Sequence, residues 1–135
     1  NEPAHRLYLL DTDFKKILLE ADAKDIDWST DGQTLLYYND FELWLYRLSD
    51  NSTALITRYG QTIQQARLIP TTEYLAVTVN NTLQTIELDG RDRRNVTSLV
   101  KGVTIDQFTI ANKAKDIFFT GTIGSQSGLF RLTIQ

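Results

Sequence analysis

The sequence predicts an all-β fold built from repeated antiparallel sheets, and three observations support this prediction. Apolar residues recur at a spacing of about 40 residues, as at Trp28, Leu68 and Phe108. Within each repeat they alternate with polar residues or form short runs, and they lack the three- and four-residue spacing of a helix. Clusters of Asp, Asn and Gly separate the runs and favour tight turns. A period near 40 carried by short strands is typical of the four-stranded blades of a β-propeller.

The chain is expected to begin with two strands and then to complete a first repeat. The segment 6–13 is an apolar run that ends in a polar turn, and 17–19 is a second short apolar run. The four strands that follow are separated by turn residues such as Thr30-Asp31-Gly32 and Ser49-Asp50-Asn51. The strands of this repeat, from the innermost to the outermost, are expected at 25–29, 35–39, 43–48 and 54–58.

The second repeat follows the same order, and the third supplies three strands. In the third strand of each repeat the side chains alternate between two faces. Trp44 and Tyr46 would lie on one face, Leu43 and Leu45 on the other, so both faces are suited to burial between neighbouring blades. The strands of these two repeats are expected at 65–69, 74–79, 83–88 and 95–99, and at 105–110, 117–120 and 129–134.

We therefore predict a single β-propeller-like domain over 1–135 with about three four-stranded antiparallel blades, that is, a partial β-propeller. Closed propellers have about 4–8 blades, so the chain is either a fragment of a larger propeller or a half-ring that dimerises. A first residue other than Met fits a processed product or an excised fragment. The repeats are expected at approximately 6–22 (a partial blade), 23–60, 61–101 and 102–135.

Two sequence patterns resemble known propellers. The run Trp28-Ser29-Thr30-Asp31-Gly32-Gln33 resembles the signature W-S-P-D-G-K of WD40-like propellers of the TolB type, with Thr30 in place of proline. The runs 43–48 and 86–95 resemble the C-terminal propeller region of bacterial PEGA-domain proteins. The resemblance implies a propeller fold and an extracytoplasmic or cell-surface location, and it supplies no catalytic residues.

Composition narrows the function classes. The 135 residues are 41% hydrophobic and 23% charged, which indicates a globular chain rather than a disordered one. The net charge of −3 gives no electrostatic basis for binding nucleic acid. Cysteine is absent, and no apolar run approaches the roughly 20 residues of a membrane-spanning helix, so we expect no membrane segment in this chain.

No residue pattern indicates catalysis, a metal or a cofactor. His5 is the only histidine, and it lies near the end of the chain, where a solvated side chain is expected. The run Gly124-Ser125-Gln126-Ser127-Gly128 lacks the central serine of a nucleophile elbow. Asp31 is expected to form a turn, as are Asp13, Asp50 and Asp89, which follow third strands at equivalent positions. We therefore predict a non-enzymatic chain without a metal site or a cofactor.

One basic run is a candidate binding site. Arg91, Asp92, Arg93 and Arg94 could pair with an anion or an acidic partner, because arginine forks match carboxylates and phosphates. The alternative is a solvated hairpin whose charges are offset in part by Asp89.

A second candidate is an aromatic surface. Its residues could form a recognition surface, but their alternation within strands favours packing. They are Tyr37, Tyr38, Trp44 and Tyr46.

The leading functional hypothesis is a non-enzymatic β-propeller that serves as a scaffold or protein–protein interaction module. Its partner would be another protein or a second copy, bound through open blade faces, which includes a homodimer. The alternative is a carbohydrate- or small-ligand-binding propeller at the cell surface, which would use aromatic and amide groups around a pocket.

Overall fold

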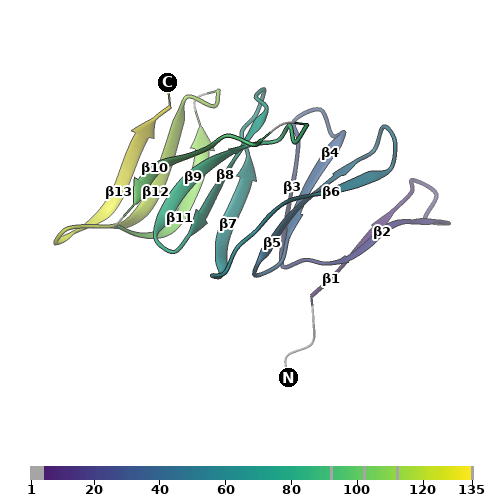
Figure 1. Ribbon diagram of the computed structural model, residues 1–135, viewed down its shortest axis with the longest axis horizontal. Helices are drawn as coiled ribbons and strands as arrows, with labels where there is room; N and C mark the ends of the chain where they lie inside the picture. The colour runs from purple at the N-terminus through teal and green to yellow at the C-terminus, as the bar shows by residue number, and fades with distance from the viewer. Residues whose placement is uncertain (1–4, 92, 102, 112, 135) are drawn as a thin grey trace. The chain divides into compact units, whose positions relative to one another are not determined.

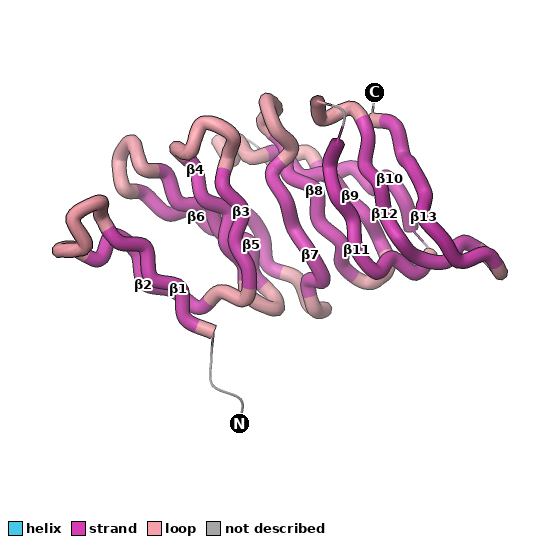
Figure 2. Tube along the Cα trace, turned by 180° about the vertical axis from the view of Figure 1, so that it is seen from behind, coloured by secondary structure: helices cyan, strands magenta, loops and turns pink. Residues whose placement is uncertain are grey.

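The structure is a computed structural model that describes residues 5–91, 93–101, 103–111 and 113–134. Figure 2 shows strands joined by loops, and no helix occurs in this part of the chain. The described residues accordingly include no helix that is long and apolar enough to cross a lipid bilayer. The predicted all-β fold class is confirmed.

The strands form four antiparallel sheets in which neighbours along the chain are neighbours in space (Figure 1). Each expected strand is present in the structure, with bounds shifted by a few residues. The sheets contain two, four, four and three strands, as the repeats predicted. The strands are β1 (Arg6–Leu10), β2 (Ile17–Asp22), β3 (Asp25–Trp28), β4 (Thr34–Tyr38), β5 (Glu42–Arg47), β6 (Ser52–Arg58), β7 (Ile63–Leu68), β8 (Tyr74–Val79), β9 (Thr82–Glu87), β10 (Val96–Lys101), β11 (Thr104–Ala111), β12 (Asp116–Ile123) and β13 (Gln126–Thr133).

The chain forms two compact units, residues 1–60 and 61–135. The first unit contains the β1–β2 hairpin and the β3–β6 sheet, and the second contains the β7–β10 and β11–β13 sheets. The boundary between the units coincides with the repeat boundary expected after residue 60. The single domain expected over 1–135 stays a prediction.

In the first unit the β1–β2 hairpin packs against one face of the β3–β6 sheet. Leu35, Tyr37 and Tyr46 are buried there. Tyr37 and Trp44 are opposite each other on β4 and β5, and their rings stack with centroids 6.3 Å apart and planes 10° apart. The partly buried residues around them are Leu7, Leu9, Leu18, Leu19, Ala21, Ala23, Trp44 and Leu48.

This packing accounts for the aromatic residues that the sequence singled out. Tyr37, Tyr38 and Tyr46 are each at most 3% exposed, so they form core and no recognition surface. Trp44 and Tyr46 share a face with Leu48, as the alternation predicted.

In the second unit a shared apolar core joins the two sheets. Phe119 stacks on Phe130 with ring centroids 5.4 Å apart, and Leu132 and Ile134 pack against the same core. A fully buried Ile, Leu or Phe side chain stabilises the fold by about 1.5–3 kcal/mol, because its apolar surface is removed from water. The buried members of the core are Ile69, Ala76, Leu83, Ile105, Phe108, Ile117 and Phe119.

A side chain of β7 also hydrogen-bonds to the backbone of β11. Gln65 Nε2 donates to the carbonyl oxygen of Phe108 at 2.9 Å, and the Phe108 N–H donates to Gln65 Oε1 at 3.0 Å. The amide side chain thus pairs with a residue of the next sheet as a strand would. Each bond contributes about 0.5–1.5 kcal/mol, and the pair fixes the register between the two sheets.

The turn before β4 has the chemistry that its sequence predicted. The Gln33 N–H donates to Asp31 Oδ1 at 3.0 Å, and Ser29 Oγ donates to the same oxygen at 2.6 Å. Gly32 has a φ of 72°, a left-handed conformation that glycine adopts without steric cost. Asp31 is therefore a turn residue, as expected.

One glycine of the second unit is required by a close approach of two backbones. Gly121 in β12 is paired with Ile105 of β11, next to a register shift between Ile105 and Gln107. A Cβ at Gly121 would lie 1.9 Å from the carbonyl oxygen of Thr104. The irregularity of β11 therefore leaves no room for a side chain at this position.

We expect Gly121→Ala to destabilise the chain by about 1–3 kcal/mol, because the methyl group has to displace the β11 backbone. Gly128→Ala is a matched control, since Gly128 is the β13 partner of Gly121 and has no atom within 4 Å of its ideal Cβ. The control should stay within about 0.5 kcal/mol of the parent chain. Equilibrium unfolding in urea measures both, and equal stabilities for the two variants would contradict this account.

Candidate functional site

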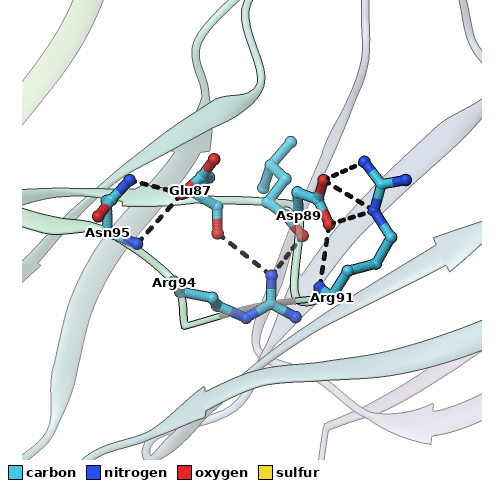
Figure 3. Close-up of polar contacts among 6 residues, drawn as sticks. Glu87, Asp89, Arg91, Arg94 and Asn95 are labelled. Atoms are coloured by element: carbon cyan, nitrogen blue, oxygen red, sulfur yellow. Dashed lines mark hydrogen bonds and ion pairs between the residues drawn. The ribbon is translucent and has the colours of Figure 1, made fainter.

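The predicted basic run lies in the connection between β9 and β10. Glu87 ends β9 and Val96 begins β10, and the Glu87 N–H donates to the carbonyl oxygen of Asn95 at 3.0 Å. This bond closes the connection at its base. Glu87 also accepts two hydrogen bonds at Oε2, from the N–H and from the Nδ2 of Asn95 at 3.2 and 2.9 Å (Figure 3).

Arg91 is held by a carboxylate two residues before it. Its Nη2 lies 2.6 Å from Asp89 Oδ2, its Nε lies 3.1 Å from both carboxylate oxygens, and its N–H donates to Oδ1 at 3.0 Å (Figure 3). These hydrogen bonds to the charged form lower the pKa of Asp89 to about 2. The Arg91 side chain is nevertheless 90% exposed, so its guanidinium is accessible to solvent.

Arg94 has a structural role within the connection. Its Nη1 donates to the carbonyl oxygens of Glu87, at 3.2 Å, and of Leu88 (Figure 3). A Cβ at Gly90 would lie 2.5 Å from Arg94 Nη2, so the guanidinium covers this glycine closely. Arg94 therefore caps the end of β9 through Nη1.

The predicted binding residues that the structure describes differ in their exposure to solvent. Arg91 and Arg93 are exposed, and Arg94 is partly buried in the connection. Asp92 lies outside the described residues. The role of this run as a binding site stays a prediction, and the exposed charge that it offers comes from Arg91 and Arg93.

Asp50 and Asp89, which follow the third strands β5 and β9 of their sheets, accept backbone hydrogen bonds in the turns after those strands. The Ser52 N–H donates to Asp50 Oδ1 at 3.1 Å, which parallels the Arg91 N–H on Asp89. In the β1–β2 hairpin this role falls to Asp11 instead of Asp13, because Asp11 Oδ1 accepts the Lys15 N–H at 2.9 Å. Within the described ranges no group of three or more His, Cys, Asp and Glu side chains is placed to hold a metal ion.

The other sequence candidates are also placed by the fold. The run 124–128 belongs to the β12–β13 hairpin, where Gly124 has a φ of 60° and the hydroxyls of Thr122 and Ser127 lie 3.0 Å apart. This is a strand-to-strand turn and differs from the strand-to-helix turn of a nucleophile elbow. His5 is exposed just before β1.

The structure reveals a cluster of exposed apolar residues that the sequence analysis did not identify. Tyr8 is 54% exposed, Leu10 41%, Phe14 79% and Ile17 52%, and all four belong to the β1–β2 hairpin. We call these four residues the hairpin patch. Leu10 and Ile17 are cross-strand partners, and Phe14 lies in the turn with a φ of 57°. The signal in the sequence was the run 7–10, which is apolar on both faces of the strand.

An ion cluster lies at the other end of the same hairpin. Arg6 Nη2 lies 2.8 Å from Glu20 Oε1, and Arg6 Nη1 lies 2.9 Å from Asp22 Oδ1. The hydrogen bonds to Glu20 and Asp22 raise the pKa of Arg6. These groups are exposed, so the cluster contributes little to stability and chiefly borders the hairpin patch with charge.

The chain is similar in structure to known β-propellers. It superposes on the β-propeller domain of Myceliophteria thermophila Cps50 (Swd1) with a TM-score of 0.72 and 11% identity, over 96% of this chain and 49% of that one. It superposes on the dihydro-heme d1 dehydrogenase NirN in complex with DHE with a TM-score of 0.68 and 14% identity, over 96% of this chain and 30% of that one. No known protein family and no curated protein matches the sequence.

These structural similarities establish the propeller fold of the chain. Sequence identities of 11% and 14% support a shared fold and nothing more specific. The chain spans about half the length of the Swd1 propeller and about a third of NirN.

We expect Arg91→Gln to raise the pKa of Asp89 from about 2 toward the ordinary value of about 3.9, because the main hydrogen-bond donor to the carboxylate is weakened. Since the folded-state pKa is the lower one, the pair stabilises the fold above pH 4 and loses this contribution as the pH falls toward 2. A carbon-detected NMR titration of the Asp89 carboxyl measures the shift. Arg93→Gln is the charge-matched control and should leave the pKa unchanged; an unchanged value in Arg91→Gln would refute the assignment.

Proposed function

We propose that the chain is a non-enzymatic β-propeller module that makes protein–protein contacts. The observation that carries this proposal is the hairpin patch of Tyr8, Leu10, Phe14 and Ile17. Single exposed apolar residues are common on protein surfaces, whereas a cluster of them is typical of an interaction surface.

The patch has the makeup of a contact surface. It combines two aromatic side chains, Tyr8 and Phe14, with two aliphatic ones, and aromatic residues are enriched in protein interfaces. The ion cluster of Arg6, Glu20 and Asp22 borders it with polar groups. An apolar centre with a charged rim favours association with another folded surface.

A second copy of the chain is a partner that this proposal makes directly testable. The chain covers 49% of the length of the Swd1 propeller, so two copies would match the length of one such ring. The number of strands limits how two copies could form a closed ring. Two copies carry 26 described strands, two more than six four-stranded blades require. A dimer would therefore have to accommodate partial sheets at its junctions.

Several observations support the absence of catalysis. Among the described residues Asp31, Asp50 and Asp89 accept hydrogen bonds in turns, and the sole histidine is exposed before β1. Acid–base or nucleophilic chemistry needs such groups to converge in one site. Because the propeller neighbours include a dehydrogenase as well as Swd1, the fold alone does not decide this point.

The exposed guanidinium groups of Arg91 and Arg93 are our second proposed contact, toward an acidic surface of a partner. An extracytoplasmic or cell-surface location also remains our proposal, and it rests on the resemblance of the sequence to bacterial propellers. Binding of a carbohydrate or small ligand is the less supported alternative, because Tyr37, Tyr38 and Tyr46 are buried.

We expect the 135-residue chain to self-associate toward twice its mass of 15.4 kDa, and the variant carrying Leu10→Thr and Phe14→Asn to associate at least about tenfold more weakly. Asn tolerates the positive φ at position 14, so the fold should be retained. Light scattering over a concentration series measures the mass. Val96→Thr is the control, because Val96 is 55% exposed but lies outside the patch.

A chain that stays monomeric at every concentration, or equal association of the patch variant and the control, would overturn self-association through the hairpin patch. A thermal-shift screen against glycans separates the alternative function, because only a ligand-binding propeller should show saturable stabilisation.

A further inference from the structure

Three segments of the chain match the pattern Asn-X-Ser/Thr, in which the asparagine can receive an N-linked oligosaccharide. The asparagines are Asn51, Asn80 and Asn95, and all three are exposed. An oligosaccharide is bulky and is joined to the side-chain amide nitrogen, so the amide has to be free to turn toward solvent and toward the modifying enzyme. The three amides differ in this respect.

The amide of Asn51 is held against the core of its sheet. Asn51 lies in the turn between β5 and β6, and the hydroxyl of Tyr46 donates to its Oδ1 at 2.6 Å. Tyr46 is only 1% exposed and belongs to the apolar cluster of the first unit. The hydrogen bond therefore fixes the plane of the Asn51 amide, and Nδ2 turns only when this bond breaks.

The amide of Asn95 is held through the atom that would carry the sugar. Its Nδ2 donates to Glu87 Oε2 at 2.9 Å, and the Asn95 N–H donates to the same oxygen at 3.2 Å (Figure 3). The backbone adds a third bond, from the Glu87 N–H to the Asn95 carbonyl oxygen at 3.0 Å. Reaction at Nδ2 therefore requires that a hydrogen bond to a carboxylate is broken first.

The amide of Asn80 has no such constraint. Asn80 and Asn81 form the two-residue turn of the β8–β9 hairpin, between the paired residues Val79 and Thr82. Their φ values of 49° and 55° are the left-handed pair that this kind of turn requires. Within the part of the chain that the structure describes, no hydrogen bond involves the Asn80 side chain. Its amide is thus free to turn at the end of the hairpin.

The hydroxyl residue of the pattern lies beside Asn80. Thr82 begins β9, and its Oγ1 donates to the carbonyl oxygen of Asn80 at 3.3 Å. A two-residue turn accounts for Asn80 and Asn81, because both adopt a positive φ, but it does not require a hydroxyl at position 82. The turn role therefore explains two residues of the pattern and leaves the third without a reason.

We propose that Asn80 is an N-glycosylation site and that the fold selects it over Asn51 and Asn95. This inference goes beyond the protein-contact function and rests on the proposed extracytoplasmic location. An oligosaccharide here would cover the β8–β9 turn and keep other proteins away from that end of the hairpin.

The reaction takes its sugar from a lipid-linked oligosaccharyl pyrophosphate. The Asn80 Nδ2 forms a bond to the anomeric carbon of the first sugar, while the bond from that carbon to the pyrophosphate oxygen breaks. The lipid pyrophosphate leaves with the electron pair, and Nδ2 gives up one proton to the transferase. Asn80 Oδ1 is unchanged, so the modified side chain keeps an amide.

The test compares the folded 135-residue chain with three synthetic peptides that span 48–56, 77–85 and 92–100. Each is incubated with a purified oligosaccharyltransferase and its lipid-linked donor, and mass spectrometry of proteolytic fragments measures the occupancy of each asparagine. We expect the folded chain to be modified at Asn80 about as fast as the 77–85 peptide. Modification of Asn51 and Asn95 should be at least about tenfold slower than in their peptides, because their hydrogen bonds have to break.

Variants separate the pattern from the fold. Thr82→Val keeps both turn asparagines and removes the hydroxyl, so it should abolish modification of Asn80. Thr82→Ser is the matched control and should retain it. Tyr46→Phe removes the hydroxyl that holds Asn51, and Glu87→Ala removes the acceptor of Asn95 Nδ2. Each should raise modification of its own asparagine several-fold and leave Asn80 unchanged.

A folded chain that stays unmodified at Asn80, equal occupancy of the three asparagines, or an unmodified 77–85 peptide would each overturn the proposal. Continued modification of Thr82→Val would overturn it as well, because the pattern would then not be what the enzyme recognises. Self-association is measured on the unmodified chain, so the two proposals fail independently.

Discussion

A β-strand places alternate side chains on opposite faces, so a sheet that is apolar on both faces has to be covered on both. The central strands β4, β5, β8 and β9 are subject to that constraint. In β4 and β5 the residues of both faces are buried, with Leu35 and Tyr46 on one side and Leu36 and Leu45 on the other. A single sheet of this kind has no stable form in water, and stacking one sheet against the next satisfies the constraint.

The two units meet the constraint with different chemistry. In the first, the hairpin of two strands covers a tyrosine-rich face, and the stacked rings of Tyr37 and Trp44 supply much of the contact. In the second, aliphatic and phenylalanine side chains fill the core, and Gln65 adds a pair of directional bonds to Phe108. Dispersion and burial hold the sheets together, while the amide pair fixes which residues face each other.

The same constraint indicates where interactions with other molecules are expected. The hairpin packs Leu7 and Leu9 against the β3–β6 sheet, while Tyr8, Leu10, Phe14 and Ile17 are exposed to solvent. In the arginine run, Arg94 caps the end of β9, whereas Arg91 and Arg93 are exposed.

The sequence by itself determined the all-β class, the order of the thirteen strands and the turn roles of Asp31, Asp50 and Asp89, because alternation and turn chemistry are local properties. Only the tertiary structure decided which side of an evenly apolar strand is buried. It assigned Leu7 and Leu9 to the core and Tyr8 to solvent, since that choice depends on which sheet the hairpin packs against. The capping role of Arg94 also emerged only from the structure, because it depends on how the β9–β10 connection folds back over the end of β9.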